Sequence, residues 1–123
     1  MKNVLIVEDS KAIRSMIRVS LEEAGGFYAA EAGNGFEALK TLPTRSFDLI
    51  ITDINMPDIN GLELIGYVKS NPSYQKIPLI IVSTEKTEED KKRGMALGAA
   101  GYVVKPFRKD ELMAMVEKVL KTE

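Results

Sequence analysis

The chain has 123 residues, of which 45% are hydrophobic and 28% are charged, so we expect one domain over residues 1–123 that buries about two-thirds of its unfolded surface. Its formal net charge of −1 gives no electrostatic reason to expect binding to nucleic acid or to a membrane surface. It contains no cysteine and no histidine, which excludes disulfides, zinc–sulfur sites and thiolate or imidazole catalysis and leaves oxygen ligands, which suit Mg²⁺, Mn²⁺ or Ca²⁺.

The first half of the chain alternates short apolar runs with amphipathic stretches. Residues 4–7 predict a strand, and residues 27–32 predict a weaker, more polar strand that suits the edge of a sheet. Residues 10–24 predict a helix, because apolar side chains recur at helical spacing. These apolar residues are Ile13, Met16, Ile17, Leu21 and Ala24. A short helix over residues 36–42 is predicted to end at Pro43, which cannot continue it.

The second half continues this alternation, with predicted strands at residues 49–52, 79–82 and 102–104. Three helices follow these strands in turn: one that Asn71-Pro72 closes, one over 87–97 and one over 109–121. The first two turns of the helix over 87–97 hold no apolar residue, so only Met95 and Leu97 are expected to anchor it. We therefore predict that this helix buries little surface and moves at a low energetic cost.

Five strand–helix units predict an α/β fold, a single-domain (βα)5 doubly wound parallel sheet with helices on both faces. The apolar runs are short and rich in Val and Ile, which is typical of strands buried on both faces of a parallel sheet. No apolar run approaches the roughly 18 residues of a membrane-spanning helix, and Met1-Lys2-Asn3 leads directly into a strand. We therefore expect a cytoplasmic protein without a signal peptide.

Polar residues follow four of the five predicted strands. Glu8-Asp9, Asp53, Ser83-Thr84 and Lys105-Pro106 stand directly after their strands. Because the carboxyl ends of parallel strands lie along one edge of the sheet, where ligands bind, we expect these groups to converge. Three carboxylates at one place are unfavourable unless one is protonated or a cation joins them, and Mg²⁺ suits such oxygen ligands. The pattern favours a site for phosphoryl transfer, with Lys105 as a point-charge phosphate binder.

Each of these groups has an ordinary structural explanation when it is considered alone. The dipole of the following helix would stabilise the negative charges of Glu8-Asp9. Asp53 would start a turn, and Ser83-Thr84 would cap a strand end. Lys105 would be a solvated lysine, and Tyr102 would pack at an edge strand. Their joint placement at one edge favours a reaction site over these separate explanations.

Four motifs resemble the receiver domain of bacterial two-component response regulators, of the stand-alone, CheY-like kind. They are the runs over residues 4–9, 52–57 with Gly61, 83–85 and 101–107. The resemblance covers the whole chain, and the motifs occur in the order and spacing of the family. It implies the flavodoxin-like strand order 2-1-3-4-5.

For the reaction site, the resemblance implies that Asp53 accepts a phosphoryl group from a sensor histidine kinase or phosphotransfer protein. Mg²⁺, with Mn²⁺ as an alternative ion, would bind the carboxylates of Glu8, Asp9 and Asp53 and the backbone carbonyl of Asn55. Ser83 and Lys105 would contact the phosphoryl group. The protein would thus assist its own phosphorylation and dephosphorylation without being an enzyme in the usual sense.

For signalling, our hypothesis is a switch in which Ser83 moves toward the phosphate, Tyr102 turns inward into the vacated space and the helix over 87–97 shifts. A downstream effector protein would then read the face formed by the helix over 87–97, the strand over 102–104 and the helix over 109–121. Three positions would tune dephosphorylation: Asn55, Thr84 and Glu85. The Lys105–Pro106 peptide bond is a candidate for the cis form, and we expect a monomer that is able to dimerise on activation.

Two departures from the commonest family pattern and three alternative functions follow from the sequence. The acidic pair is Glu-Asp rather than Asp-Asp, and Thr84 stands where Ala or Gly is commoner, which would narrow access to Asp53. A haloacid-dehalogenase-like phosphatase would need a second Asp at position 55, where this chain has Asn. FMN binding would need a phosphate cradle where the loop over residues 8–11 is acidic. A pseudo-receiver would bind partners without taking up phosphate.

Overall fold

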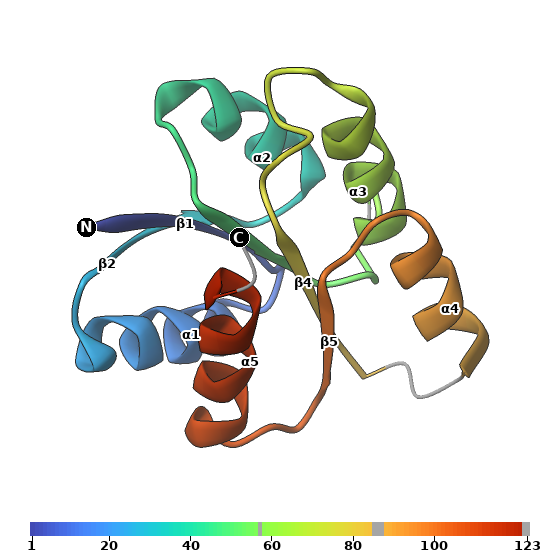
Figure 1. The fold of residues 1–123 in the computed structure, drawn as a ribbon. Coiled ribbons are helices and arrows are strands. Elements are labelled where there is room, and N and C mark those ends of the chain that lie inside the picture. Colours follow the sequence, from blue (N-terminus) through green and yellow to red (C-terminus); the bar gives the residue numbers. More distant parts are fainter. Residues whose placement is uncertain (57, 85–87, 122–123) are drawn as a thin grey trace.

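The computed structural model of the chain describes residues 1–56, 58–84 and 88–121. Strands and helices alternate throughout these residues (Figure 1), as the sequence predicts. The strands are β1 (Lys2–Val7), β2 (Phe27–Ala32), β3 (Leu49–Thr52), β4 (Leu79–Ser83) and β5 (Gly101–Val104). The helices are α1 (Lys11–Ala24), α2 (Gly35–Thr41), α3 (Gly61–Ser70), α4 (Glu88–Ala96) and α5 (Lys109–Lys121), with a 3-10 turn η1 (Leu42–Thr44) after α2.

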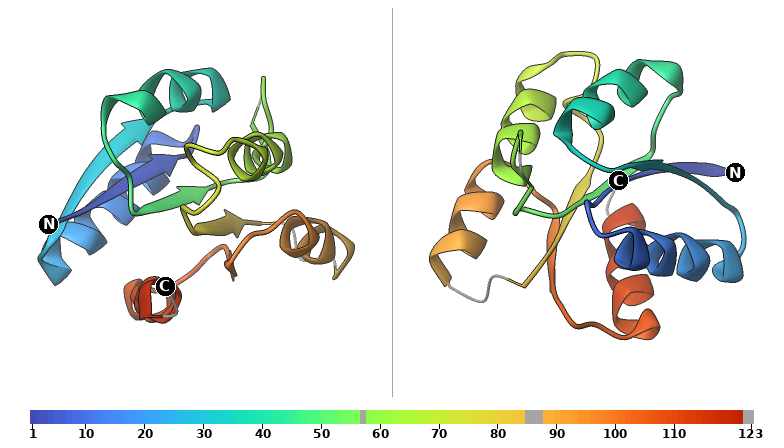
Figure 2. Two further views of the ribbon diagram at one scale, coloured as in Figure 1. Left: turned by 45° about the horizontal axis from the view of Figure 1, so that its top comes forward. Right: turned by 180° about the vertical axis from the view of Figure 1, so that it is seen from behind.

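All strands pair in parallel in the order β2-β1-β3-β4-β5, which confirms the predicted topology. Helices α1 and α5 cover one face of the sheet, and α2, α3 and α4 cover the other (Figures 1 and 2). The polar strand β2 lies at one edge, as expected. The register pairs Val7 with Thr52 and Ser83 with Val104, so these strands end at nearly the same level.

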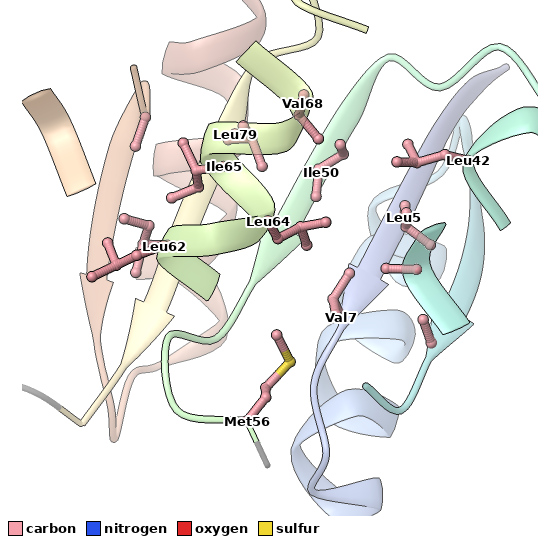
Figure 3. Close-up of a cluster of buried hydrophobic side chains, with 14 of the residues drawn as sticks. Leu5, Val7, Leu42, Ile50, Met56, Leu62, Leu64, Ile65, Val68 and Leu79 are labelled. Atoms are coloured by element: carbon pink, nitrogen blue, oxygen red, sulfur yellow. The ribbon is translucent and has the colours of Figure 1, made fainter. Parts of the chain in front are cut away.

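Successive residues of each central strand contribute to different faces of the sheet. Leu5 and Val7 pack in the cluster beneath α2 and α3 (Figure 3), whereas Val4 and Ile6 pack in the cluster beneath α1 and α5. All residues of β3 and β4 are buried, which explains why their sequences lack polar alternation. The central strands are therefore held rigidly from both sides, and their carboxyl ends provide a fixed platform for the site.

Local side-chain hydrogen bonds define where the helices begin. Asn60 and Glu63 form a capping box at the start of α3, in which each side chain accepts a hydrogen bond from the other residue's backbone amide. Ser10 and Asn34 cap α1 and α2 in the same manner, by accepting from the amides three residues later. These caps place the β1–α1 and β3–α3 loops, which carry the acidic residues, in defined positions.

The structure corrects two details in the first half of the chain. Met16 and Ala24 were predicted to lie on the apolar face of α1, but both are exposed, Met16 by 43%, because the helix buries the stripe that contains Ile17 and Leu21 instead. Pro43 does not end α2 abruptly. It lies inside the 3-10 turn η1, because its fixed φ suits the first turn of a helix even though it has no amide hydrogen to donate.

Helix α4 is anchored differently from the prediction. Met95 and Leu97, the expected anchors, have exposed fractions of 41% and 42%, and Gly94 is the buried residue of the helix. A Cβ atom on Gly94 would lie 2.3 Å from the Cδ1 of Ile81, so the bare backbone of α4 rests directly on β4. The prediction that α4 buries little surface is confirmed, and its mobility stays a prediction.

Candidate functional site

The sheet continues by one residue beyond the ends of its strands and so fixes the backbone of the site. The amide of Glu8 donates to the carbonyl of Ala32 (3.0 Å), and the amide of Asp53 donates to the carbonyl of Val7 (3.0 Å). The amide of Lys105 donates to the carbonyl of Ser83 (2.9 Å). These bonds bring residues from β1, β3, β4 and β5 to one edge, where the sequence predicted a site.

Three carboxylates meet at this edge. One oxygen each from Glu8, Asp9 and Asp53 lies within 4.8 Å of the others, a spacing that allows all three to bind one cation. The exposed fractions of Glu8 and Asp53 are only 2% and 6%, whereas Asp9 is exposed. Two carboxylates are thus largely removed from water, and the third lies open to solvent, which provides a route of entry for an ion.

Lys105 forms ion pairs with two of these carboxylates. Its Nζ lies 2.5 Å from Glu8 Oε1 and 3.1 Å from Asp53 Oδ2, and its side chain is buried with them. Burial lowers the pKa of Lys105, but the bonds to Glu8 and Asp53 outweigh it and raise the pKa above its usual value, so the ammonium group stays charged. One ammonium group with three ionised carboxylates leaves two negative charges, which a divalent cation would balance.

Burial is also the main influence on Glu8. It raises the pKa of this carboxyl group, and the charge of Asp53 acts in the same direction. The ammonium group of Lys105 and the amide of Ser10, which donates to Glu8 Oε2 at 2.9 Å, oppose this shift without cancelling it. Glu8 therefore ionises less readily than an exposed glutamate, and a bound cation would favour its charged form.

Asn55 and Gly61 shape the loop that follows Asp53. The amide of Asn55 donates to Asp53 Oδ1 (3.3 Å), which places the Asn55 backbone beside the carboxylate. A Cβ atom on Gly61 would lie 2.1 Å from the carbonyl oxygen of Asp53, so only a residue without a side chain fits there. Thr52 Oγ1 donates to this same carbonyl at 3.0 Å. Asp53 is thus held through both its backbone and its side chain.

The remaining predicted residues lie around this centre. Ser83 is fully buried at the end of β4, and Tyr102 is half-buried in β5 against the cluster beneath α2 and α3. Thr84 is exposed and borders an apolar hollow of about 330 Å³ that adjoins Lys105. The Lys105–Pro106 peptide bond is cis, as expected. Glu85 lies outside the described residues.

Arg14 contributes to the site, although it was not among the residues predicted from the sequence. Its Nη1 donates to the backbone carbonyl of Glu8 at 2.6 Å, and its Nε forms an ion pair with Glu31 in β2 at 2.9 Å. The guanidinium group thereby ties the acidic loop to the neighbouring strand. Arg14 lies one turn into the helix that follows the acidic pair, and this position is the signal that could have identified it.

Comparisons with known proteins identify relatives along nearly the whole chain. A family model for the response regulator receiver domain matches residues 4–117. The chain is 34% identical to the chemotaxis protein CheY of Pseudomonas aeruginosa, over 94% of both chains. It is 37% identical to the phosphate regulon transcriptional regulatory protein PhoB of Rhizobium meliloti, over 96% of this chain but 52% of that protein. The chain therefore spans about half the length of that regulator.

Solved structures give the same result. The chemotaxis protein CheY4 of Vibrio cholerae superposes with a TM-score of 0.91 at 38% sequence identity, and the match covers 97% of this chain and 98% of that one. Among the helices described, none has the length and hydropathy that a membrane crossing requires. Receiver domains are signalling switches that bind Mg²⁺ in an acidic pocket and interact with histidine kinases and downstream effectors. With its family match and its acidic cluster, this chain belongs to the receiver domains of response regulators, which are phosphorelay switches.

Proposed function

We propose that Asp53 is the phosphoacceptor of this receiver domain and that a histidine kinase supplies the phosphoryl group. A carboxylate oxygen of Asp53 attacks the phosphorus of the phosphohistidine, and the bond between phosphorus and the imidazole nitrogen breaks. The imidazole keeps the electron pair of that bond, and an acyl phosphate forms on Asp53. The observation that carries this proposal is the group of three carboxylates, two of them buried, in which Lys105 contacts Asp53 directly.

Glu8, Asp9, Asp53 and the backbone carbonyl of Asn55 would hold Mg²⁺, with Mn²⁺ as an alternative ion. When bound, the cation supplies positive charge that offsets the carboxylates and the incoming phosphoryl oxygens. The donor set fits this ion, because it consists of oxygens and carries two uncompensated negative charges after Lys105 is counted. The protein's own contribution is to position these groups before the donor arrives.

Lys105 and Ser83 would bind the transferred phosphoryl group. Lys105 Nζ already lies 3.1 Å from Asp53 Oδ2, so a phosphoryl group on this carboxylate arrives within its reach. To bind it, the ammonium group exchanges part of its contact with Glu8 for phosphoryl oxygens. Charge-assisted hydrogen bonds of this kind are worth roughly 1.5 to 3 kcal/mol each. The same groups would assist both phosphorylation and the later hydrolysis, so the chain acts on itself rather than on a released substrate.

Incubation of the purified protein with acetyl phosphate and Mg²⁺ is expected to add one phosphoryl group, measured as intact mass. The reaction needs no kinase, because the groups that stabilise the transferring phosphoryl group belong to this chain. Chelation of the metal with EDTA should block the uptake, since the carboxylates would then repel the donor's charge. Labelling of equal extent in EDTA would contradict the proposed metal dependence, and no labelling in Mg²⁺ would favour a pseudo-receiver.

For the response, we propose that Ser83 moves toward the phosphoryl group, Tyr102 turns inward and α4 shifts. A phosphoryl group adds about −1.5 to −2 charge. Reversing a 1:99 equilibrium needs about 5.5 kcal/mol, which two or three charge-assisted bonds supply if most of them are absent in the inactive form. Helix α4 suits this role, because Gly94 is the one buried residue among those described in it, so little buried surface opposes a shift of the helix. The face of α4, β5 and α5 would then bind a downstream effector.

Replacement of Ser83 by Ala is expected to leave phosphorylation intact but to reduce the structural response. The measurement is the shift of backbone amide signals in α4 and β5 when beryllofluoride and Mg²⁺, which mimic the acyl phosphate, are added. The wild-type shifts should shrink by more than half, because the hydroxyl that links the phosphate to the switch is missing. Shifts of full size in Ser83→Ala would show that the response does not pass through Ser83.

Several further properties are proposed on the family resemblance. Asn55, Thr84 and Glu85 would tune dephosphorylation, and Thr84 is exposed beside a hollow that Lys105 also lines. We expect residues 1–123 to form one receiver domain that is a monomer and is able to dimerise on activation. We expect no direct binding to nucleic acid or to a membrane. A cytoplasmic location follows from the expected kinase partner. The comparisons do not favour a haloacid-dehalogenase-like phosphatase, and they match receiver domains instead.

A further inference from the structure

The loop between β3 and α3 determines where two groups of the site point, because it begins at Asp53 and contains Asn55. Packing and the start of α3 hold Ile54 and Met56, whereas Asn55 between them is exposed. Ile54 and Met56 are buried, with exposed fractions of 5% and 9% (Met56 is labelled in Figure 3). The amide of Gly61 donates to the carbonyl of Ile54 at 2.9 Å. These contacts leave the outer part of the loop, at residues 58 and 59, to be held by something else.

Asp58 and Ile59 fasten this outer part to α2. Asp58 Oδ1 accepts hydrogen bonds from the amides of Ile59 (2.7 Å) and Gly35 (3.3 Å), and the second bond spans 23 residues of sequence. Gly35 is buried beneath Ile59, and a Cβ atom on Gly35 would lie 2.5 Å from the Cβ of Ile59. The absence of a side chain at Gly35 is therefore what lets the loop approach α2 closely enough for the Asp58 bond.

The charge of Asp58 strengthens this connection. Desolvation opposes ionisation of the carboxyl group, but hydrogen bonds from the amides of Ile59, Gly35, Asp58 itself and Phe36 outweigh it and lower its pKa. Asp58 is therefore ionised at neutral pH, and its bonds to the amides are charge-assisted. The positive end of the α2 dipole acts in the same direction.

We infer that Asp58 is a positioning residue for the metal site. By fastening the outer end of the β3–α3 loop to α2, it holds the Asn55 carbonyl and the Asp53 carboxylate in place for a cation. Without this bond, the loop has more conformations to lose when an ion binds, so the affinity for the ion falls. The inference rests on the proposed function, because it assumes that these groups bind Mg²⁺.

Replacement of Asp58 by Ala is expected to raise the dissociation constant for Mg²⁺ by about three- to tenfold, from the loss of a charge-assisted bond partly exposed to solvent. The measurement is a titration with Mg²⁺ alone, followed through the amide signals of Asp53 and Asn55. Asn34→Ala is the matched control. It removes a comparable bond at the start of α2, from the amide of Glu37 to Asn34 Oδ1 (2.8 Å), and leaves the loop untouched. Both variants should lower the urea midpoint to a similar extent, and only Asp58→Ala should weaken Mg²⁺ binding.

A third variant separates positioning from simple loss of charge. Asp58→Asn keeps an oxygen that accepts from the amides of Gly35 and Ile59, although through weaker, neutral bonds, so its dissociation constant should lie between those of the wild type and Asp58→Ala if position is what matters. Equal weakening in Asp58→Asn and Asp58→Ala would assign the effect to the charge of Asp58 and overturn the inference. Equal weakening in Asp58→Ala and Asn34→Ala would assign it to the stability of α2, with the same consequence. Wild-type affinity in Asp58→Ala overturns the inference alone, whereas absence of Mg²⁺ binding by the wild type overturns the proposed function as well.

Discussion

Replacement of Asp53 by Ala is expected to reduce phosphoryl uptake from acetyl phosphate to background. The acceptor oxygen is lost, and the two neighbouring carboxylates are not positioned to replace it as phosphoryl acceptors. Asp9 is exposed, and Glu8 is occupied by Lys105 at 2.5 Å and by the amide of Ser10 at 2.9 Å. The variant should remain folded, because removal of one of three clustered carboxylates relieves repulsion. Intact mass gives the uptake, and circular dichroism confirms the fold.

Asp48 provides a control on the same strand. It directly precedes β3, as Asp53 directly follows it, and its Oδ2 accepts from the amide of Asn3 (2.8 Å) at the opposite end of the sheet. Asp48→Asn should therefore take up one phosphoryl group like the wild type. Equal uptake by Asp53→Ala and the wild type would refute the assignment of Asp53, and loss of uptake in both variants would point to a general effect on folding.

The architecture could be predicted because the sequence pattern reflects burial directly. Strands β3 and β4 are apolar at nearly every position, since helices cover both faces of the sheet. Parallel pairing then places the residues after each strand at one edge, so the meeting of Glu8, Asp53 and Lys105 followed from topology alone. Lys105 could be placed in this way beside residues 52 and 97 positions away, Asp53 and Glu8, without any knowledge of their side-chain contacts.

Contacts that depend on side-chain reach could not be predicted in the same way. The sequence indicated that Lys105 joins the acidic group, but not that it pairs with Glu8 more closely than with Asp53. The anchoring of α4 through Gly94 was not predicted. A hydropathy pattern identifies large apolar residues as buried, but it does not indicate where the backbone of a helix packs directly against a strand residue, as α4 does against Ile81. From the sequence, Asp58 is typical of an ordinary turn residue, and its hydrogen bond from the amide of Gly35 becomes evident only in the folded structure. The roles of Ser83 and Tyr102 depend on a change of state, and they stay predictions.

Replacement of Lys105 by Met is expected to lower the free energy of unfolding in metal-free buffer by about 3 kcal/mol, at the low end for breaking a buried ion pair. The variant keeps an unbranched side chain that is one atom shorter than lysine. It leaves Glu8 and Asp53 without a cation, at exposed side-chain fractions of only 2% and 8%. Lys109→Met is the matched control. Lys109 Nζ also lies 2.5 Å from a carboxylate, that of Glu23, but both side chains are more than half exposed, so the loss should stay below about 1 kcal/mol.

The loss of stability in Lys105→Met, measured as the free energy of unfolding, should depend on pH and on Mg²⁺. The folded-state pKa of Glu8 is raised, so between its unfolded and folded values the folded state binds more protons, and stability increases as the pH falls through this window. Removal of Lys105 takes away a group that lowers this pKa, so the window extends to higher pH and stability increases more steeply on acidification. The difference in the free energy of unfolding between variant and wild type should therefore shrink from alkaline to mildly acidic pH.

Millimolar Mg²⁺ should also reduce this difference in the free energy of unfolding at neutral pH, because the ion binds the folded state and replaces the missing positive charge. Urea unfolding with EDTA and with Mg²⁺ measures both effects, and a loss that is insensitive to pH and to Mg²⁺ would show that Lys105 stabilises the fold through packing rather than through its charge.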